Sequence, residues 1–263
     1  MIIIKIGGGK EINLKGIAAD LANVKEPFVI VHGANAARDE LAAGLNVEKK
    51  VVTSLSGYSS VLSDETTIDL MMMAYAGLKN KRIVEMLQQN GINAIGLSGL
   101  DGRMIEGKRN TGIKVREEGK TKILRDFSGK PKKINIALLN LLIENGYAPV
   151  LCVPLIDENS VAINSENDDI VALLQTELKA DKIIQLIEAP GFLKDKNDPG
   201  SVIKSITQKE LEAFENSVEG RMKRKILAIR KLFEAGPTKV FIYDGRGENP
   251  VIDALNEKGT IVS

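Results

Sequence analysis

The chain has few of the residues on which several classes of enzyme depend. Its 263 residues include one cysteine, one histidine and no tryptophan, and only 4% are aromatic. Because Cys152 is alone, it cannot form an internal disulfide, and a zinc site of clustered Cys and His ligands is excluded. A hydrolytic triad could use no histidine except His32, and no Gly-x-Ser-x-Gly elbow is present. We therefore expect His32 and Cys152 to be structural residues of the core.

A strong charge of one sign and a long hydrophobic run are also missing. The 36 Lys and Arg nearly balance the 35 Asp and Glu, so the net charge of +1 points to no particular partner and does not favour nucleic acid. The apolar runs are far shorter than the ~18 residues that span a bilayer, so no membrane segment is predicted. The N-terminus leaves no room for a signal peptide, and we expect a cytoplasmic protein.

The sequence does contain an alternation of short apolar runs and helical patterns. The runs are rich in Ile and Val and are bounded by Gly or Pro, which is typical of buried parallel strands. They cover residues 2–6, 28–31, 92–97, 148–153, 183–187 and 240–243. The longest helical pattern covers about residues 64–90, with Ser63 as a candidate N-cap and Gly91 at its end. Strands and helices in alternation predict the α/β class.

Residues 103–133 interrupt this alternation with short β-like pieces and turn signals, so we expect hairpins that project from the sheet. The segment holds eleven Lys or Arg against four Asp or Glu, a local charge of +7. Such a segment could face an acidic partner or could be a solvated edge, and the two interpretations are equally supported.

Two glycine-bearing turns are the first candidates for a functional site. Gly7, Gly8 and Gly9 follow the first predicted strand, which also carries Lys5, and Gly33 and Ala34 follow the second. The carboxyl ends of neighbouring parallel strands open into one crevice, where backbone N–H groups without a nearby Cβ can approach an anion. The pattern favours a phosphate site, although three glycines alone more often form a simple turn.

Two charged segments in the second half could serve such a site. Asn164 and Asp168 precede a predicted helix at 170–178, and a basic run that includes Lys225 opens another helix. Acids in a first helical turn are usually dipole partners, and basic runs are usually solvated faces. Neither segment decides the function by itself.

Taken together and in this order, these stretches resemble the amino acid kinase family from Met1 to Ser263. The resemblance implies a three-layer α/β/α sandwich with a mainly parallel sheet, folded as a single domain 1–263. A lobe of about residues 1–160 would bind the carboxylate substrate and form a dimer, and a lobe of about 161–263 would bind ATP. Lys5 and Lys225 would stabilise the transferring phosphoryl group, and Asp168 would hold both lysines.

The resemblance also implies roles for the turns. Gly7, Gly8, Gly9, Gly33 and Ala34 would bind the phosphates of ATP, with Mg²⁺ as the accompanying cation and no metal held directly by the protein. Phosphoryl transfer between oxygens depends on positioning and charge neutralisation, and a carboxylate is already ionised at neutral pH, so no general base is needed.

One departure favours a branch of the family. Acetylglutamate kinases carry an arginine for the α-carboxylate of the free substrate, and its counterpart is Val61. The surrounding residues Gly57, Tyr58 and Ser59 are more similar to enzymes that act on 2-aminoadipate or glutamate attached to an amino-group carrier protein. These four residues and Asn164 are the predicted substrate contacts.

Three functions follow as alternatives. The leading one is a kinase for the carrier-bound amino acid in lysine and possibly arginine biosynthesis, with Lys108, Arg109 and Lys114 docking a small acidic carrier protein. The second is acetylglutamate kinase acting on free N-acetyl-L-glutamate, and the third is a non-catalytic amino acid sensor. Met71, Met72, Tyr75 and Leu78 could form the face of a homodimer, with core packing as the favoured alternative.

Overall fold

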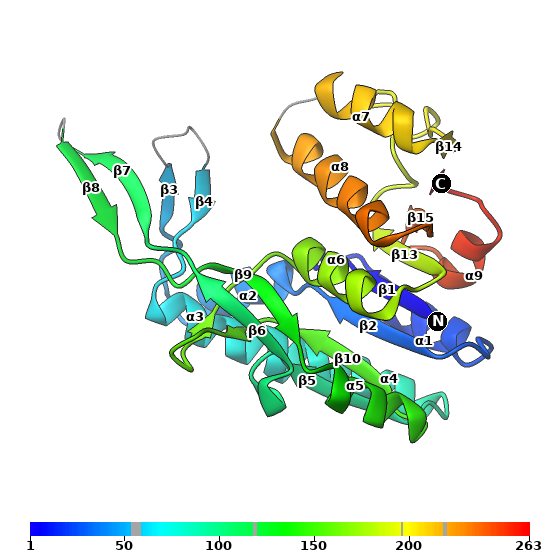
Figure 1. The fold of residues 1–263 in the computed structure, drawn as a ribbon, viewed down its shortest axis with the longest axis horizontal. Helices are drawn as coiled ribbons and strands as arrows, with labels where there is room; N and C mark the ends of the chain where they lie inside the picture. The colour runs from blue at the N-terminus through cyan, green and yellow to red at the C-terminus, as the bar shows by residue number, and fades with distance from the viewer. Residues whose placement is uncertain (54–58, 118–119, 196, 218–219) are drawn as a thin grey trace.

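One twisted sheet runs through the whole molecule (Figure 1). The computed structural model describes residues 1–53, 59–117, 120–195, 197–217 and 220–263. In these residues the main sheet has eight strands in the order β14-β16-β15-β13-β1-β2-β10-β5, and all neighbours are parallel except β15 and β16. The strands are β1 (Ile2–Ile6), β2 (Phe28–His32), β5 (Ala94–Ser98), β10 (Ala148–Cys152), β13 (Lys182–Ile187), β14 (Ser205–Ile206), β15 (Lys239–Asp244) and β16 (Thr260–Val262). The predicted α/β class with a mainly parallel sheet is confirmed.

Helices cover both faces of this sheet, which confirms the three-layer sandwich. Ile2, Ile4 and Ile6 of β1 face a cluster with α1 (Leu14–Leu21), α4 (Asn80–Gln89) and α9 (Pro250–Leu255). Ile3 faces the other cluster, which includes α6 (Asn167–Leu178) and α8 (Gly220–Leu232). The other α-helices are α2 (Asn35–Gly44), α3 (Glu65–Met71), α5 (Ile136–Glu144) and α7 (Gln208–Ser217), and short 3₁₀ turns lie at η2 (Asp101–Arg103) and η3 (Phe233–Ala235). β1 is central because its isoleucines are buried on both faces.

The long helical pattern at 64–90 forms, but with two differences. It consists of α3, a π-helical part η1 (Met72–Lys79) and α4 in direct succession, and the periodicity gave no sign of the π-helical part. The predicted N-cap Ser63 is wrong. Asp64 caps the helix, because its carboxylate accepts a hydrogen bond from Thr67 N–H at 2.9 Å, whereas the buried Ser63 hydroxyl accepts one from Asn164 Nδ2 at 3.1 Å.

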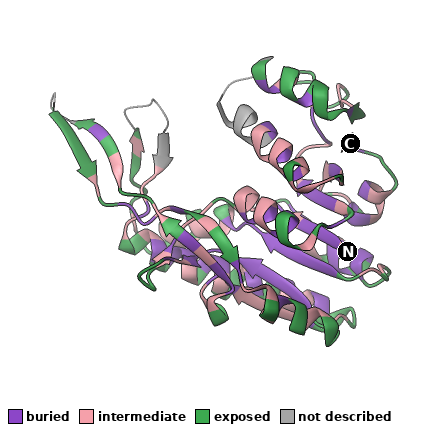
Figure 2. Cartoon of the chain, in the orientation of Figure 1, coloured by how far each residue is buried: buried purple, intermediate pink, exposed green. Residues whose placement is uncertain are grey.

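Two ribbons project from one end of the molecule, and the expected hairpins in 103–133 are confirmed (Figure 1). β6 (Ile105–Arg109) pairs with β9 (Gly129–Ile134), and between them β7 (Ile113–Glu117) pairs with β8 (Lys120–Leu124). A second ribbon of β3 (Val51–Thr53) and β4 (Ser59–Val61) projects from the same end of the molecule. The two-residue strands β11 (Leu155–Ile156) and β12 (Ala162–Ile163) complete the sheet of β6 and β9. Figure 2 shows that β8 and part of β7 are exposed, unlike the strands of the main sheet.

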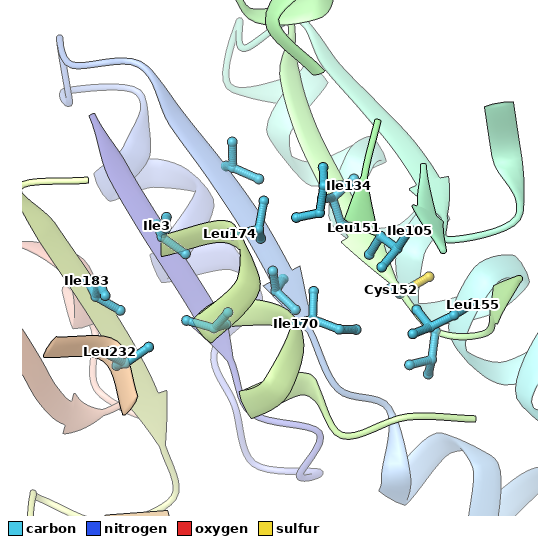
Figure 3. Close-up of a cluster of buried hydrophobic side chains, with 14 of the residues drawn as sticks. Ile3, Ile105, Ile134, Leu151, Cys152, Leu155, Ile170, Leu174, Ile183 and Leu232 are labelled. Carbon is cyan, nitrogen blue, oxygen red and sulfur yellow. The ribbon is translucent and has the colours of Figure 1, made fainter. Parts of the chain in front are cut away.

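The larger core cluster lies between the sheet and α6 (Figure 3). Ile170 and Leu174 of α6 pack there with Ile3, and Leu232 approaches from α8. Cys152 is fully buried in the same cluster, as expected from the sequence, and burial raises the pKa of its thiol to about 12.

The apolar side chains that could have formed a dimer face divide between core and surface. Met71 and Tyr75 are buried in the larger cluster and Met72 packs against it, whereas Leu78 is exposed. Core packing, the favoured interpretation, is therefore confirmed for Met71 and Tyr75.

Several predicted boundaries hold closely. Gly91 ends its helix as predicted, with φ of 76°, and Gly146 follows α5 with φ of 78°, a conformation that favours glycine. Strand β5 begins at Ala94, two residues later than predicted. No helix in the described ranges is long and apolar enough to cross a membrane.

Candidate active site

The carboxyl ends of β1 and β2 bring the predicted catalytic residues toward α6. Lys5, on the same face of β1 as Ile3, donates a hydrogen bond from Nζ to the carboxylate of Asp168 in the first turn of α6. Their side chains are 13% and 24% exposed, so the ion pair is partly shielded yet open to a ligand. Two of the three predicted catalytic residues, 163 positions apart, therefore meet at one point.

The two glycine turns lie against each other. A Cβ on Gly8 would stand 2.8 Å from Ala34 N and 2.9 Å from the Gly33 carbonyl carbon, and a Cβ on Gly33 would stand 2.8 Å from Gly8 N. Such separations exclude any side chain without a backbone shift. The glycine turns that end β1 and β2 therefore lie side by side, as expected from the parallel pairing of the two strands.

The backbone amides of these turns are not equivalent. Gly7 N–H donates to Leu186 O and Gly33 N–H donates to Ile6 O, each at 2.9 Å. Within the described ranges the Gly8 N–H donates no hydrogen bond, although Gly8 O accepts one from Ala36 N–H at 2.9 Å. Gly8 therefore offers a free donor to an anion, whereas Gly33 mainly permits the close approach.

Helix α2 adds a positive end to the same place. It begins at Asn35, directly after Ala34, which makes no side-chain cap hydrogen bond as its N-cap. The unpaired amides and the dipole of a helix N-terminus attract anions. The Glu188 carboxylate lies against Gly9, where it fills the space that a side chain at residue 9 would need. The same carboxylate accepts a hydrogen bond from Glu11 N–H at 2.8 Å.

Two polar residues near the first turn of α6 were not predicted from the sequence to belong to the site. Asn167 Nδ2 lies 3.3 Å from the position of a Cβ on Gly33, and its buried Oδ1 has no hydrogen-bond partner among the described residues. Tyr75 forms a hydrogen bond with the Asn35 side chain. Asn167 could have been noticed because it lies inside the segment 164–168, whereas nothing in the local pattern distinguished Tyr75 from a core residue.

Lys225 falls on α8, but its side chain lies outside the described residues. Helix α8 packs on α6 and brings Ile226, Ile229 and Leu232 into the core cluster. Near its end, Lys231 Nζ lies 3.7 Å from Asp169 Oδ1. The backbone thus places the third predicted catalytic residue on the helix that covers α6.

The predicted substrate residues separate into three groups. Gly57 and Tyr58 lie outside the described residues, and Ser59 is placed only by its backbone in β4. Asn164 joins the end of β12 to Ser63 before α3. Val61 lines a pocket of about 390 Å³ between α2 and α3.

The pocket at Val61 contains paired charges. Arg38 and Lys49 form ion pairs with Asp39 at 2.7 and 2.9 Å, and Lys50 forms one with Asp64 at 2.9 Å. These cations hold the pKa of both aspartates below its usual range, against the opposite effect of desolvation. The positive charges near Val61 are thus already balanced by carboxylates.

The three residues predicted to dock a carrier differ in their surroundings. Lys108 and Lys114 are exposed on β6 and β7. Arg109 instead lies over the ring of Phe127, 3.8 Å from its centroid, and its Nε donates to Asp126 O at 3.0 Å. Arg109 therefore also stabilises the base of the ribbon.

A metal cluster is not found in the part of the chain that the structure describes: no three Asp, Glu, His or Cys side chains gather there in a way that could hold an ion. The arrangement at β1, β2 and α6 combines a lysine, a carboxylate, a free amide and a helix N-terminus. Such groups can bind an anion and neutralise charge that develops on a phosphoryl group.

Known proteins resemble this chain over its whole length. The amino acid kinase family model matches residues 1–244. The [LysW]-aminoadipate kinase of Thermus thermophilus is 40% identical and that of Deinococcus radiodurans 39%; each match covers 100% of this chain, and they cover 100% and 91% of those proteins. An acetylglutamate kinase of Methanopyrus kandleri is 30% identical, with both chains fully covered.

Solved structures agree with the fold. The smu.665 protein of Streptococcus mutans has a TM-score of 0.74 at 22% identity, covering 100% of this chain and 98% of its own. An isopentenyl phosphate kinase has a TM-score of 0.65 at 18% identity, with both chains fully covered.

Proposed function

The chain belongs to the amino acid kinase family and is a phosphotransferase, and we propose that it phosphorylates a carrier-bound amino acid. The acceptor would be the side-chain carboxylate of 2-aminoadipate or glutamate attached to an amino-group carrier protein, and the product an acyl phosphate for lysine and possibly arginine biosynthesis. The observation that carries the proposal is the ion pair of Lys5 with Asp168 beside the Gly8 and Gly33 turns, in a chain fully covered by relatives named [LysW]-aminoadipate kinase.

ATP is the expected phosphoryl donor, as in other kinases. The free Gly8 amide and the N-terminus of α2 would bind its phosphates, while Lys5 would neutralise the charge that spreads over the transferring group. Asp168 would keep Lys5 in place, and Lys225 would approach from α8. The acceptor carboxylate is ionised at neutral pH, so it attacks without a general base.

Mg²⁺ would arrive as part of the nucleotide. A magnesium ion usually keeps several waters and is bound by substrate phosphates with one or two carboxylates. The Asp168 carboxylate in the first turn of α6 is already paired with Lys5, and the Glu188 carboxylate lies against Gly9 and accepts a hydrogen bond from Glu11 N–H. The phosphates would therefore supply most of the ligands.

The carrier-bound substrate is favoured over free acetylglutamate by two relatives, 40% and 39% identical over the whole chain, that are named [LysW]-aminoadipate kinase. Both substrates are blocked at the amino group and keep an α-carboxylate, so the ion pairs of Arg38, Lys49 and Lys50 with aspartates do not distinguish them. A carrier protein, unlike a free amino acid, presents an extended surface to exposed cations of the ribbon, such as Lys108 and Lys114. A non-catalytic sensor would have no need for the partly buried ion pair of Lys5 with Asp168.

Two further parts of the proposal concern organisation. The lobe of about residues 1–160 would bind the substrate and the lobe of about 161–263 would bind ATP. A homodimer would use the exposed Met73 and Leu78 on η1 as part of its interface.

Trapping with hydroxylamine tests the reaction. The enzyme with MgATP should give a hydroxamate from carrier-bound 2-aminoadipate or glutamate, and a weaker one from free N-acetylglutamate. Lys5→Met, Asp168→Asn and Lys225→Met should each lower kcat about 100-fold or more, because their contacts strengthen as charge develops. Lys15→Met, an exposed lysine on α1, is the matched control. A complete absence of trapped product from every acidic substrate would refute the kinase.

Charge reversal tests the carrier. Replacing Lys108 and Lys114 by Glu should lower kcat/KM for the carrier-bound substrate and should make kcat/KM less dependent on salt concentration. The value of kcat should stay nearly unchanged, because charges at the rim of an interface act mainly on association. The same reversal at the exposed Lys15 and Lys25, outside the ribbon, is the control for net charge. Equal effects of the two reversals would remove the ribbon from the docking surface.

A further inference from the structure

The π-helical part η1, between α3 and α4, lies against the turn that joins β2 to α2. η1 and α2 pack against each other, and Tyr75 and Asn80 are five residues apart at this crossing. Tyr75 lies in the π-helical part and Asn80 is the first residue of α4 after it, and π-helical segments are frequent at functional sites. The two side chains reach the same turn from opposite faces of the sheet.

Tyr75 acts on the α6 side of the turn. Its ring is buried, and its hydroxyl hydrogen bonds with Asn35 Oδ1 at the first residue of α2. Burial raises the pKa of Tyr75 to about 12, although the Arg38 charge and the Ala34 N–H beside the hydroxyl lower it. The hydroxyl therefore remains protonated, donates to Asn35 and presents its oxygen to the Ala34 N–H.

Asn80 acts on the other side through His32. Asn80 Nδ2 lies 3.2 Å from His32 Nε2 and donates to Val150 O at 2.9 Å, and His32 Nδ1 lies 3.2 Å from Gly33 O. A carbonyl oxygen only accepts, so Nδ1 carries the proton and Nε2 accepts from Asn80. Burial lowers the pKa of His32 to about 4, which keeps this neutral tautomer.

Both contacts act on one peptide unit. Gly33 O and Ala34 N belong to the same planar group, so fixing the two atoms fixes its orientation. Gly8 lies directly on this peptide, and its own N–H is the free donor of the site. A rotation of the Gly33–Ala34 peptide would therefore displace the Gly8 amide.

We propose that Tyr75 and the Asn80–His32 pair are positioning residues that clamp the Gly33–Ala34 peptide and so aim the Gly8 amide at the transferred phosphate. The role rests on the proposed kinase function. It also explains why a single buried histidine ends β2 with no acid partner: it orients a backbone carbonyl and takes no proton in the reaction.

Three substitutions separate positioning from simple packing. Tyr75→Phe removes one hydroxyl and keeps the ring, His32→Leu removes the donor to Gly33 O, and His32→Asn keeps a donor near the place of Nδ1. Tyr243→Phe is the control, because it removes a hydroxyl that lies 3.4 Å from Asp253 Oδ2, far along the chain from the turn. Each variant would be measured for kcat, KM for ATP, thermal midpoint and hydrogen exchange of the amides at 34–36.

Tyr75→Phe and His32→Leu should lower kcat about tenfold, the effect of one lost hydrogen bond, and should speed exchange at 34–36 by a similar factor. His32→Asn should recover most of both losses. Tyr243→Phe should change neither kcat nor the exchange at 34–36, although its thermal midpoint should be close to that of Tyr75→Phe.

Hydrogen exchange does not depend on turnover, so the two proposals can fail separately. If the unmutated protein makes no acyl phosphate while exchange at 34–36 responds as expected, the kinase fails and the clamp stands as a structural device. If Tyr75→Phe and His32→Leu leave kcat and exchange unchanged, or if His32→Asn is no better than His32→Leu, the clamp is refuted. A change in exchange without any change in kcat would also overturn its role in positioning the phosphate site.

Discussion

The buried His32 predicts a loss of stability between about pH 6.5 and pH 4. Burial disfavours the charged ring, and Lys79 and Lys81 add to this, so its native pKa lies at about 4 against an unperturbed 6.5. Below pH 6.5 the unfolded chain therefore binds a proton that the folded chain does not. The stabilisation is fully present above pH 6.5 and declines as the pH falls toward 4.

The size of the effect follows from the two pKa values. At about 1.36 kcal/mol for each pH unit, the linkage relation gives a loss of about 2 kcal/mol by pH 5 and about 3 kcal/mol by pH 4. Protonated Nε2 would also face the Asn80 amide, which is itself a donor toward the ring. A loss of this size is a large part of the stability of an ordinary domain.

Two measurements check this reasoning. Because the chain has one histidine, its ring proton resonance can be followed without assignment, and it should not titrate between pH 8 and pH 5. The free energy of unfolding, measured with urea at pH 8, 6 and 5, should fall more steeply for the unmutated protein than for His32→Asn. The carboxylates titrate in the same way in both proteins, so the difference reports on His32. A ring that titrates near pH 6.5, or equal declines in the two proteins, would refute the assignment of a neutral buried His32.

Three further predictions concern other parts of the fold. Gly8→Ala should destabilise the protein by about 1 to 3 kcal/mol and lower kcat about 100-fold, since the new methyl group meets the backbone at Ala34; urea unfolding and hydroxamate assays test this. Thr207→Ala should cost about 1 kcal/mol in urea unfolding, because the capping box with Glu210 is lost. Asp20→Ala should cost about 3 kcal/mol in the same assay, since the first turn of α9 loses a buried carboxylate that accepts from two amides.

Much of the fold followed from local patterns. The apolar runs located the six longer strands of the main sheet apart from shifts of one or two residues, because strands buried on both faces read as continuous Ile and Val. The spacing of Thr207 and Glu210 is that of a capping box, and their reciprocal hydrogen bonds form in the structure. The N-cap at residue 63 was wrong since adjacent Ser and Asp are both good caps, and the choice depends on which side chain the tertiary structure engages.

The glycines of the candidate site, Lys5 and Asp168 could be predicted from the sequence, because these residue types are typical of sites for phosphate chemistry. Tyr75 and Asn80 were not, because they lie inside a helical pattern and acquire a role only where a π-helical part brings them to the turn. The fold, the family and the transferase activity are confirmed, whereas the lobe boundary at about residue 160 and a cytoplasmic location stay predictions.

The place of β1 in the main sheet has a consequence for synthesis of the protein. Residues 2–6 are made before the other strands of the sheet, and one of their two neighbours, β13, is made about 180 residues later. On the ribosome, β1 can pair with β2 early, while its other edge stays open until residue 187 has emerged. Long-range parallel pairing of this kind folds slowly. Nascent chains of this enzyme should therefore need protection from aggregation for most of their translation.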